Sequence, residues 1–219
     1  MGFARTVLGD IKGEDLGFTY THEHLYAVPP VCQKDRDLEL SSYENSVKEL
    51  LNFKSVGGQT LVEASTLDYG RNLGLLKKMA QETGVHVIGT TGFNKHIYYP
   101  EWVEEKSVEE IADLLAGDIT EGDKESGVRA GFIKIGTWYN QIHPLEEKTT
   151  IAAAIAHNKT GAPVWGHTEA GTMGMEVLDL LEQEQVDLTR VALGHLDRNA
   201  DEYYLLKLES IFSLTVPVK

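Results

Sequence analysis

The sequence predicts an α/β fold, because strand-like and helix-like segments alternate along its 219 residues. The strand candidates are short and rich in β-branched residues, and the segments between them have the spacing of amphipathic helices. Alternation of this kind indicates βαβ units and a parallel sheet. A histidine or lysine also ends four of the strands, and the strand ends of a closed barrel all meet at one rim. These observations favour a TIM-like (β/α)8 barrel over a doubly wound open sheet.

The expected elements follow one another in regular order. Six strands are expected, at residues 17–24, 59–65, 85–91, 130–136, 162–167 and 190–195. Helices are expected between them, at residues 41–55, 72–82, 107–115, 146–158 and 172–184. Ser107 opens a capping-box pattern, and Gly84 and Gly161 follow two helix ends, as C-terminal caps do.

The number of units predicts an incomplete barrel. We count about six and a half of eight strand–helix units, against roughly 250 residues for a typical barrel. Residues 1–219 are therefore expected to form a single barrel domain, truncated after about strand 6 or 7, with residues 210–219 where strand seven belongs. A fragment, a frameshifted reading frame and a natural short form are all open. The first two are favoured because nothing in the tail is shaped to cap an open sheet, whose bare edges invite pairing with other chains.

Composition excludes several partner classes. The formal net charge of -14 argues against nucleic acid and anionic membranes, since both need a basic surface. A single cysteine, Cys32, rules out an internal disulfide. The first residues lack the apolar region of a signal peptide, and no apolar run has membrane-spanning length. A cytoplasmic location is expected, and self-association as a homodimer stays open.

Histidines and one lysine carry the chemistry. His22 and His24 end the first strand, and residues two apart on a strand share a face. Histidine is a common zinc ligand, although this pair by itself is not specific. Lys134 lies in an apolar strand, where a buried ammonium is costly. Its side chain either reaches out to solvent at the strand end or loses its proton and reacts with CO2 to form a carbamate that can bridge two cations.

His167 and His195 each follow a glycine at the end of the fifth and sixth strands. The order of the four histidines and Lys134 along the chain resembles that of the binuclear amidohydrolase superfamily. The sequence segments around them resemble its phosphotriesterase-related branch. The matching segments are GFTYTHEHL from residue 17, GVHVIGTTG from 84, GFIKIG from 131, GHTEAG from 166 and GHLDRN from 194. The resemblance covers nearly the whole chain and implies a distorted TIM barrel that hydrolyses lactones or, less often, phosphotriesters and carboxyl esters.

The resemblance also implies a metal centre. It implies His22 and His24 on a buried metal ion, His167 and His195 on an exposed one, and carboxylated Lys134 between them. Zinc is expected, with manganese or cobalt as alternatives. Such a metal pair lowers the pKa of a bridging water, so that hydroxide attacks the substrate. The family's aspartate at the end of strand eight has no counterpart here, which puts turnover by this chain in doubt.

Further candidates keep two interpretations each. Asp197 either orients a ligand or relays a proton, or it caps the following helix. Glu63 either orients a metal-binding histidine or is an ordinary carboxylate at a strand end. Lys95, His96 and Arg71 either bind an anionic group, for instance the phosphate of a sugar lactone, or are solvated loop charges.

The leading hypothesis is therefore a metal-dependent hydrolase acting on a small lactone or related ester. The alternatives are a catalytically impaired or binding-only form and an enzyme that cleaves a cyclic amide. Metal content and lactonase assays would separate these three.

Overall fold

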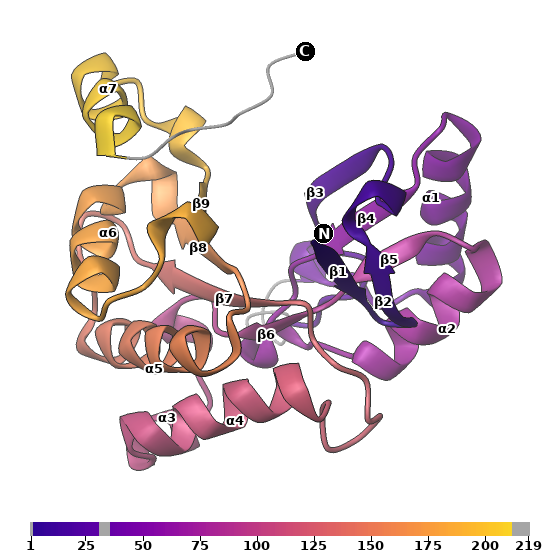
Figure 1. Cartoon of the computed structure of the whole chain (residues 1–219), viewed down its shortest axis with the longest axis horizontal. Coiled ribbons are helices and arrows are strands. Elements are labelled where there is room, and N and C mark those ends of the chain that lie inside the picture. Colours follow the sequence, from indigo (N-terminus) through magenta and orange to yellow (C-terminus); the bar gives the residue numbers. More distant parts are fainter. Residues whose placement is uncertain (1, 31–35, 212–219) are drawn as a thin grey trace.

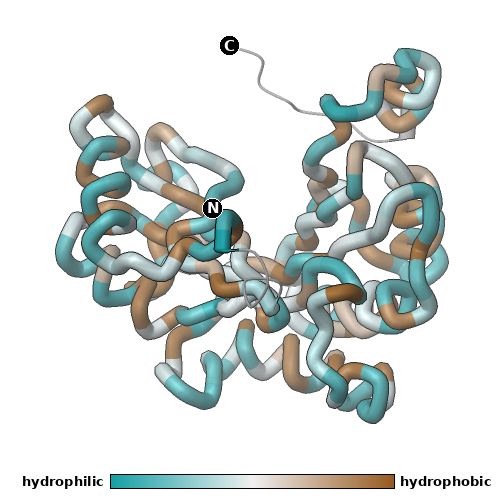
Figure 2. The backbone as a smooth tube through the Cα atoms, turned by 180° about the vertical axis from the view of Figure 1, so that it is seen from behind, coloured by the Kyte–Doolittle hydropathy of each residue, from teal (hydrophilic) through white to brown (hydrophobic). Residues whose placement is uncertain are grey.

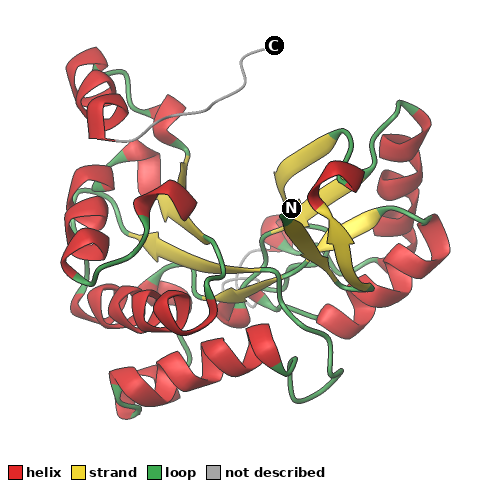
Figure 3. Ribbon diagram, viewed as in Figure 1, coloured by secondary structure: helices red, strands yellow, loops and turns green. Residues whose placement is uncertain are grey.

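A computed structural model describes residues 2–30 and 36–211 of the chain. Cys32 and most of the expected seventh strand, residues 212–219, lie outside the described residues. Helices lie on the outside of the strands, as Figure 3 shows. Among the described helices, none combines the length and the apolar composition that a membrane crossing needs.

The chain begins with an antiparallel hairpin that the sequence reasoning missed. Strands β1 (Phe3–Thr6) and β2 (Gly9–Lys12) pair with each other. Gly9 takes a positive φ of 124°, and the Thr6 hydroxyl donates to its carbonyl at 2.8 Å. The amide of Val7 then donates to the carbonyl of Val87 at 2.8 Å, which ties the hairpin to the barrel.

The barrel strands are parallel and follow the order of the sequence. They are β3 (Thr19–Glu23), β4 (Thr60–Glu63), β5 (His86–Ile88), β6 (Thr90–Gly92), β7 (Phe132–Thr137), β8 (Val164–Thr168) and β9 (Val191–Gly194). They form two sheets in the orders β3-β4-β5 and β6-β7-β8-β9. The expected strand at 85–91 is divided at Gly89, so β5 and β6 together take the place of the third barrel strand. Sequential parallel order confirms the barrel prediction over an open doubly wound sheet.

Seven α-helices are described. They are α1 (Tyr43–Ser55), α2 (Leu73–Thr83), α3 (Trp102–Glu105), α4 (Val108–Thr120), α5 (Pro144–Thr160), α6 (Gly174–Gln183) and α7 (Glu202–Ile211). The expected ends hold where capping chemistry marks them: Ser107 and Glu110 form a capping box, and Gly84 and Gly161 end their helices with positive φ. The short helix α3 was not predicted. Single-turn 3-10 helices include η4 (Leu67–Tyr69), η5 (His96–Tyr98), η6 (Glu169–Gly171) and η8 (Leu196–Arg198).

The core lies between the strands and the helices. Its fully buried side chains include Leu50, Leu73, Met79, Ile111, Leu115, Ile133 and Ile135. Hydrophobic and hydrophilic stretches alternate along the helices, as Figure 2 shows, which fits helices with one buried face. In Figure 1, β3 and β9 face each other across the top of the molecule. Within the described residues neither strand has a second neighbour, so the barrel wall is open between them.

Candidate metal centre

Two imidazoles come from the end of the first barrel strand. His22 lies in β3 and His24 follows it, and their ring centroids are 5.2 Å apart. The expected adjacency of the two side chains is therefore present. The Nε2 atom of His22 is buried and has no hydrogen-bond partner among the described residues. A buried polar atom without a partner is costly, and an unprotonated ring nitrogen at this position would be satisfied by a metal ion.

The other two expected histidines lie against this pair. His167 lies in β8, and His195 follows β9 with a positive φ of 68°. The His195 ring centroid is 5.3 Å from that of His22 and 4.7 Å from that of His167. The fold thus gathers four imidazoles from three strands into one cluster. Trp165, which sequence reasoning did not single out, stacks on His22 with ring centroids 4.4 Å apart.

Lys134 lies inside the barrel, beside this cluster. It belongs to β7, is 1% exposed, and its Nζ donates to the carbonyl of Ala64 at 2.9 Å. The Nζ atom also lies 5.1 Å from the centroid of the Trp165 ring. Burial lowers the pKa of Lys134 to about 8, against the opposing pull of the Glu63 and Asp68 carboxylates. Solvation at the strand end is therefore wrong as an interpretation of this lysine.

The histidines are neutral at physiological pH. Burial, followed by the nearby Lys134 charge, lowers the pKa of His22 to about 3 and that of His24 to about 2. Burial lowers the pKa of His167 to about 4, and it also lowers the pKa of His195. Neutral imidazole is the form that binds metal ions.

Glu63 reaches His24 through a hydroxyl group. The Ser65 hydroxyl donates to the Glu63 carboxylate at 2.6 Å, and Nδ1 of His24 lies 2.9 Å from the same hydroxyl oxygen. Glu63 ends β4 and is 1% exposed, and burial raises its pKa to about 7. The contact favours the interpretation of Glu63 as a residue that orients a histidine. The sequence reasoning missed Ser65, whose place two residues after Glu63 was the available signal.

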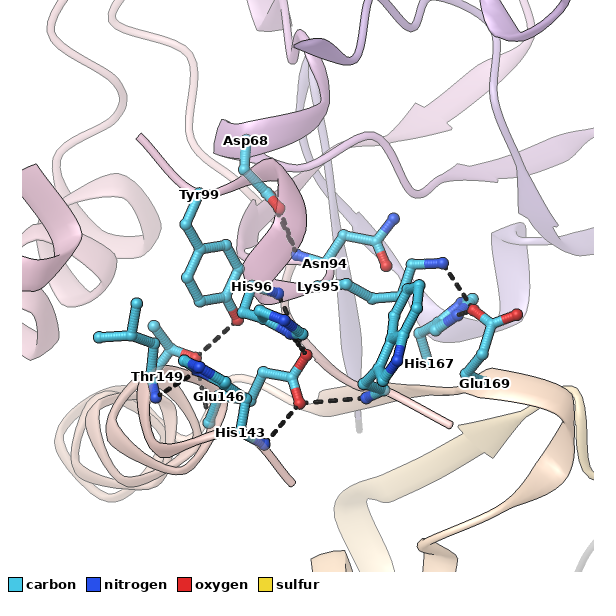
Figure 4. Close-up of polar contacts among 12 residues, drawn as sticks. Asp68, Asn94, Lys95, His96, Tyr99, His143, Glu146, Thr149, His167 and Glu169 are labelled. Atoms are coloured by element: carbon cyan, nitrogen blue, oxygen red, sulfur yellow. Dashed lines mark hydrogen bonds and ion pairs between the residues drawn. The ribbon is translucent and has the colours of Figure 1, made fainter. Parts of the chain in front are cut away.

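Lys95 is not a free charge. Its Nζ donates to Oε2 of Glu169 at 2.6 Å, and the same oxygen lies 3.1 Å from Nε2 of His167, as Figure 4 shows. The hydrogen bond with His167, together with Lys95, lowers the pKa of Glu169 to about 2. The Lys95 ammonium also lies 5.0 Å from the centroid of the Trp138 ring. The Glu169 carboxylate already pairs with the Lys95 ammonium. The position expected for a substrate anion is therefore occupied by a side chain of the protein itself.

The other two proposed anion ligands are engaged elsewhere. Arg71 pairs with Asp118 of α4 at 2.5 Å, with both side chains less than 10% exposed. Asp118 also accepts from the Thr91 hydroxyl at 2.6 Å, so this cluster joins strand β6 to a helix outside the barrel. The expectation that Arg71 contacts substrate is corrected accordingly. Nδ1 of His96 lies 2.7 Å from the buried carboxylate of Glu146, so this ring nitrogen serves the loop structure.

Asp197 lies in η8 and is exposed, and within the described residues its side chain forms no hydrogen bond. Within the part of the chain that the structure describes, its side chain therefore caps no helix, and its role toward a ligand or a proton stays a prediction. Burial lowers the pKa of His195, and the charge of Asp197 opposes this effect.

The donor chemistry fits divalent metal ions, although the donors do not converge on one point. Within residues 2–30 and 36–211, no three His, Cys, Asp or Glu side chains form a group that could hold an ion. The fit rests on the partnerless Nε2 of His22, the neutral imidazoles and the buried amine of Lys134. Nitrogen donors of this type suit zinc, and also cobalt or manganese once a bridging carboxylate is added.

Comparison with known proteins identifies the family. Residues 3–214 match the model of the phosphotriesterase family. The "Phosphotriesterase homology protein" of Escherichia coli K12 is 37% identical over 193 residues, which cover 88% of this chain and 66% of that protein. A "Phospho-furanose lactonase" of Mycoplasmopsis synoviae is 34% identical over 223 residues, which cover 94% of this chain and 63% of that one.

Solved structures agree. A lactonase from Listeria monocytogenes has 38% identity and a TM-score of 0.91, over 95% of this chain and 70% of that chain. The chain spans somewhat less than two thirds of the length of the two curated relatives named above, 66% of the Escherichia coli protein and 63% of the Mycoplasmopsis synoviae protein. The predicted resemblance is confirmed: the chain belongs to the phosphotriesterase family.

Proposed function

We propose that this chain carries the metal centre of a hydrolase that cleaves the ester bond of a lactone. One observation carries the proposal: four neutral imidazoles from three strands gather beside a buried lysine, and one of them has a buried nitrogen with no hydrogen-bond partner in the described part of the chain. The named family members support hydrolysis, since they include a lactonase and an "Aryldialkylphosphatase".

In this proposal His22 and His24 hold one divalent ion and His167 and His195 hold a second, with zinc as the expected metal. Lys134, if carboxylated by CO2, would add an anionic ligand to this centre. When bound, such an ion pair supplies a water of lowered pKa and polarises the carbonyl oxygen of the substrate. Burial lowers the pKa of Lys134 to about 8, so the neutral amine, which is the form that reacts with CO2, is more accessible than in an exposed lysine.

The chain's own residues prepare this centre. The Ser65 hydroxyl contacts Nδ1 of His24 and donates to the Glu63 carboxylate, and these two contacts orient the ring. The Trp165 indole stacks on one face of the His22 ring. Burial keeps His24 neutral, and the neutral imidazole is the form that binds a metal ion.

The proposed substrate is a small lactone, including phosphorylated sugar lactones. The name of the Mycoplasmopsis synoviae relative supports this class, and so does the solved E. coli relative "complexed with phosphate in active site". A phosphate group that reached Lys95 would compete with Glu169 for the ammonium. We therefore expect the phosphate to replace Glu169 as the partner of the Lys95 ammonium.

The test combines metal analysis with turnover. The purified chain is dialysed against zinc and bicarbonate, and the metal content is measured by mass spectrometry alongside hydrolysis of phosphorylated and unphosphorylated γ-lactones. We expect two ions per chain and lactone turnover, both lost in Lys134→Gln. Lys159→Gln, at a half-exposed lysine paired with Asp113, is the matched control and keeps both. Wild-type protein that binds no zinc, cobalt or manganese would refute the proposal.

A further inference from the structure

One buried carboxylate joins two loops at the rim of the barrel. Glu146 lies in the first turn of α5 and is fully buried. Its Oε2 accepts from the backbone amides of Trp138 and His143, at 3.0 Å each, and its Oε1 accepts from the amide of His96 at 3.1 Å. Nδ1 of the His96 ring lies 2.7 Å from the same Oε1, as Figure 4 shows. Glu146 therefore contacts the loop after β6 as well as the loop after β7.

Helix capping accounts for only one of these contacts. In a capping box the carboxylate of the third helical residue accepts from the amide of the N-cap residue, which here is His143. The contacts with His96 and Trp138 lie outside that motif and reach segments 50 and 8 residues away. A fully buried carboxylate is costly unless it is hydrogen-bonded, and Glu146 meets this need with donors from two loops. Besides starting a helix, the residue therefore ties these loops together.

The amides that Glu146 holds lie beside a cation and an indole. The His96 amide belongs to the peptide bond that follows Lys95, and the Lys95 ammonium lies 5.0 Å from the centroid of the Trp138 ring. The His96 ring stacks on His143 and meets Trp138 edge-on, with ring centroids 4.1 and 5.7 Å apart, so side-chain packing supports the same arrangement. One carboxylate therefore fixes the backbone at both Lys95 and Trp138, a pair that we call the rim wall.

The rim wall lies next to the proposed metal centre. The Lys95 ammonium donates to Oε2 of Glu169 at 2.6 Å, and this oxygen lies 3.1 Å from Nε2 of His167. In the proposed function, a phosphate group of the substrate replaces Glu169 as the partner of Lys95. An anion can do so only if the ammonium stays at the position that its loop sets. The geometry of this loop therefore affects substrates that carry a phosphate and not those that lack one.

We propose that Glu146 is a positioning residue that holds Lys95 and Trp138 in place and so sets the preference for phosphorylated over unphosphorylated lactones. The inference rests on the proposed function, since such a preference requires a lactone hydrolase. The carboxylate contacts His96, Trp138 and His143, which the proposed metal centre does not use. Its positioning role can therefore be measured without a metal ion.

The first measurement uses metal-free protein labelled with 5-fluorotryptophan. The sequence has three tryptophans, and the 19F NMR signal of Trp138 is the one lost in Trp138→Phe. We expect Glu146→Gln to move this signal in the same direction as Lys95→Met, because in both variants the ammonium no longer lies over the indole. Glu147→Gln, at the exposed neighbouring carboxylate of the same helix turn, is the matched control and leaves the signal unchanged. An unmoved Trp138 signal in Glu146→Gln would overturn the inference, whether or not the protein hydrolyses a lactone.

The second measurement compares kcat/KM of the zinc-loaded protein for phosphorylated and unphosphorylated γ-lactones. For Glu146→Gln we expect a fall of about 10-fold or more with the phosphorylated substrate only, since displacing a substrate-positioning group by about 1 Å can cost about 100-fold. In the Lys95→Met background the same change should cause no further loss of preference, because both changes act through one contact. An equal fall for both substrates would show a merely structural role and would overturn the inference while the proposed function stands.

A shorter carboxylate covers the case in which Glu146→Gln does not fold. Glu146→Asp keeps a negative charge at the start of α5, where such a charge is favourable, but its side chain is too short to reach the donors of both loops. We expect the Trp138 signal and the substrate preference to change in the same direction as in Glu146→Gln. An Asp variant with both unchanged would refute the positioning role. Wild-type protein that hydrolyses neither class of lactone would refute the proposed function, and the Trp138 signal then decides the positioning role by itself.

Discussion

Replacing Glu63 by glutamine should remove a large pH dependence from the stability of the protein. Burial raises the pKa of Glu63 from 4.5 to about 7 in the folded chain. The folded state therefore holds this proton to higher pH than the unfolded state does. Its stabilising contribution is complete below about pH 4.5 and is lost as the pH rises through about 7. A shift of this size, at 1.36 kcal/mol per unit, corresponds to about 3 kcal/mol.

The assay compares urea unfolding of the wild-type and Glu63→Gln proteins at several pH values from about 4.5 to about 8. We expect the variant to gain about 3 kcal/mol relative to wild type across this range, because glutamine keeps an acceptor for Ser65 without titrating. Asp68, whose pKa burial raises to about 6, has the same sign and cancels in the difference. Glu49→Gln, at an exposed carboxylate on α1, controls for the lost charge. A difference between the two proteins that does not change with pH would refute the reasoning.

Two further predictions concern stability. Arg71→Met leaves the Asp118 carboxylate buried without its cation and should cost about 3–5 kcal/mol in urea unfolding, and the added change Asp118→Asn should recover part of this loss. Gly92→Ala should lower the unfolding midpoint far more than Gly57→Ala. Both glycines have positive φ, at 98° and 95°, but only at Gly92 would a Cβ meet backbone, 2.0 Å from the carbonyl oxygen of Lys134. Equal midpoints for the two alanine variants would contradict the packing explanation.

Hydrophobic patterning was enough to locate the barrel elements. Each of the six expected strands has a counterpart in the described residues, and five expected helices are present. The division of the third strand was not predictable from that pattern. A Cβ at Gly89 would lie 2.4 Å from Leu73 of α2, so the glycine admits a helix whose position the sequence does not specify. The backbone carbonyl of Gly89 accepts a hydrogen bond from the amide of Gly131, at the break between β5 and β6.

The candidate site was predictable in its residue types and not in its contacts. The order of histidines and lysine along the strands led to the cluster, whose metal binding stays a prediction. Arg71 and Lys95 look alike in the sequence as basic residues in loops after strands. Only the structure separates them, because Asp118 and Glu169 approach them from elements 47 and 74 residues away. Tertiary partners at such separations leave no periodic signal.

The meeting of the histidines depends on packing inside the barrel. His22 lies on edge strand β3 and His195 follows edge strand β9, and within the described residues no strand joins these two edges. Their rings are nevertheless 5.3 Å apart. The Trp165 indole stacks on His22 and meets His195 edge-on, with ring centroids 4.4 and 5.8 Å apart. A Cβ at Gly194 would lie 2.2 Å from this indole, so the glycine before His195 makes room for it. Because stacked and edge-to-face contacts between rings are favourable, Trp165 connects His22 and His195 across two strand edges that no backbone ladder joins within the described residues.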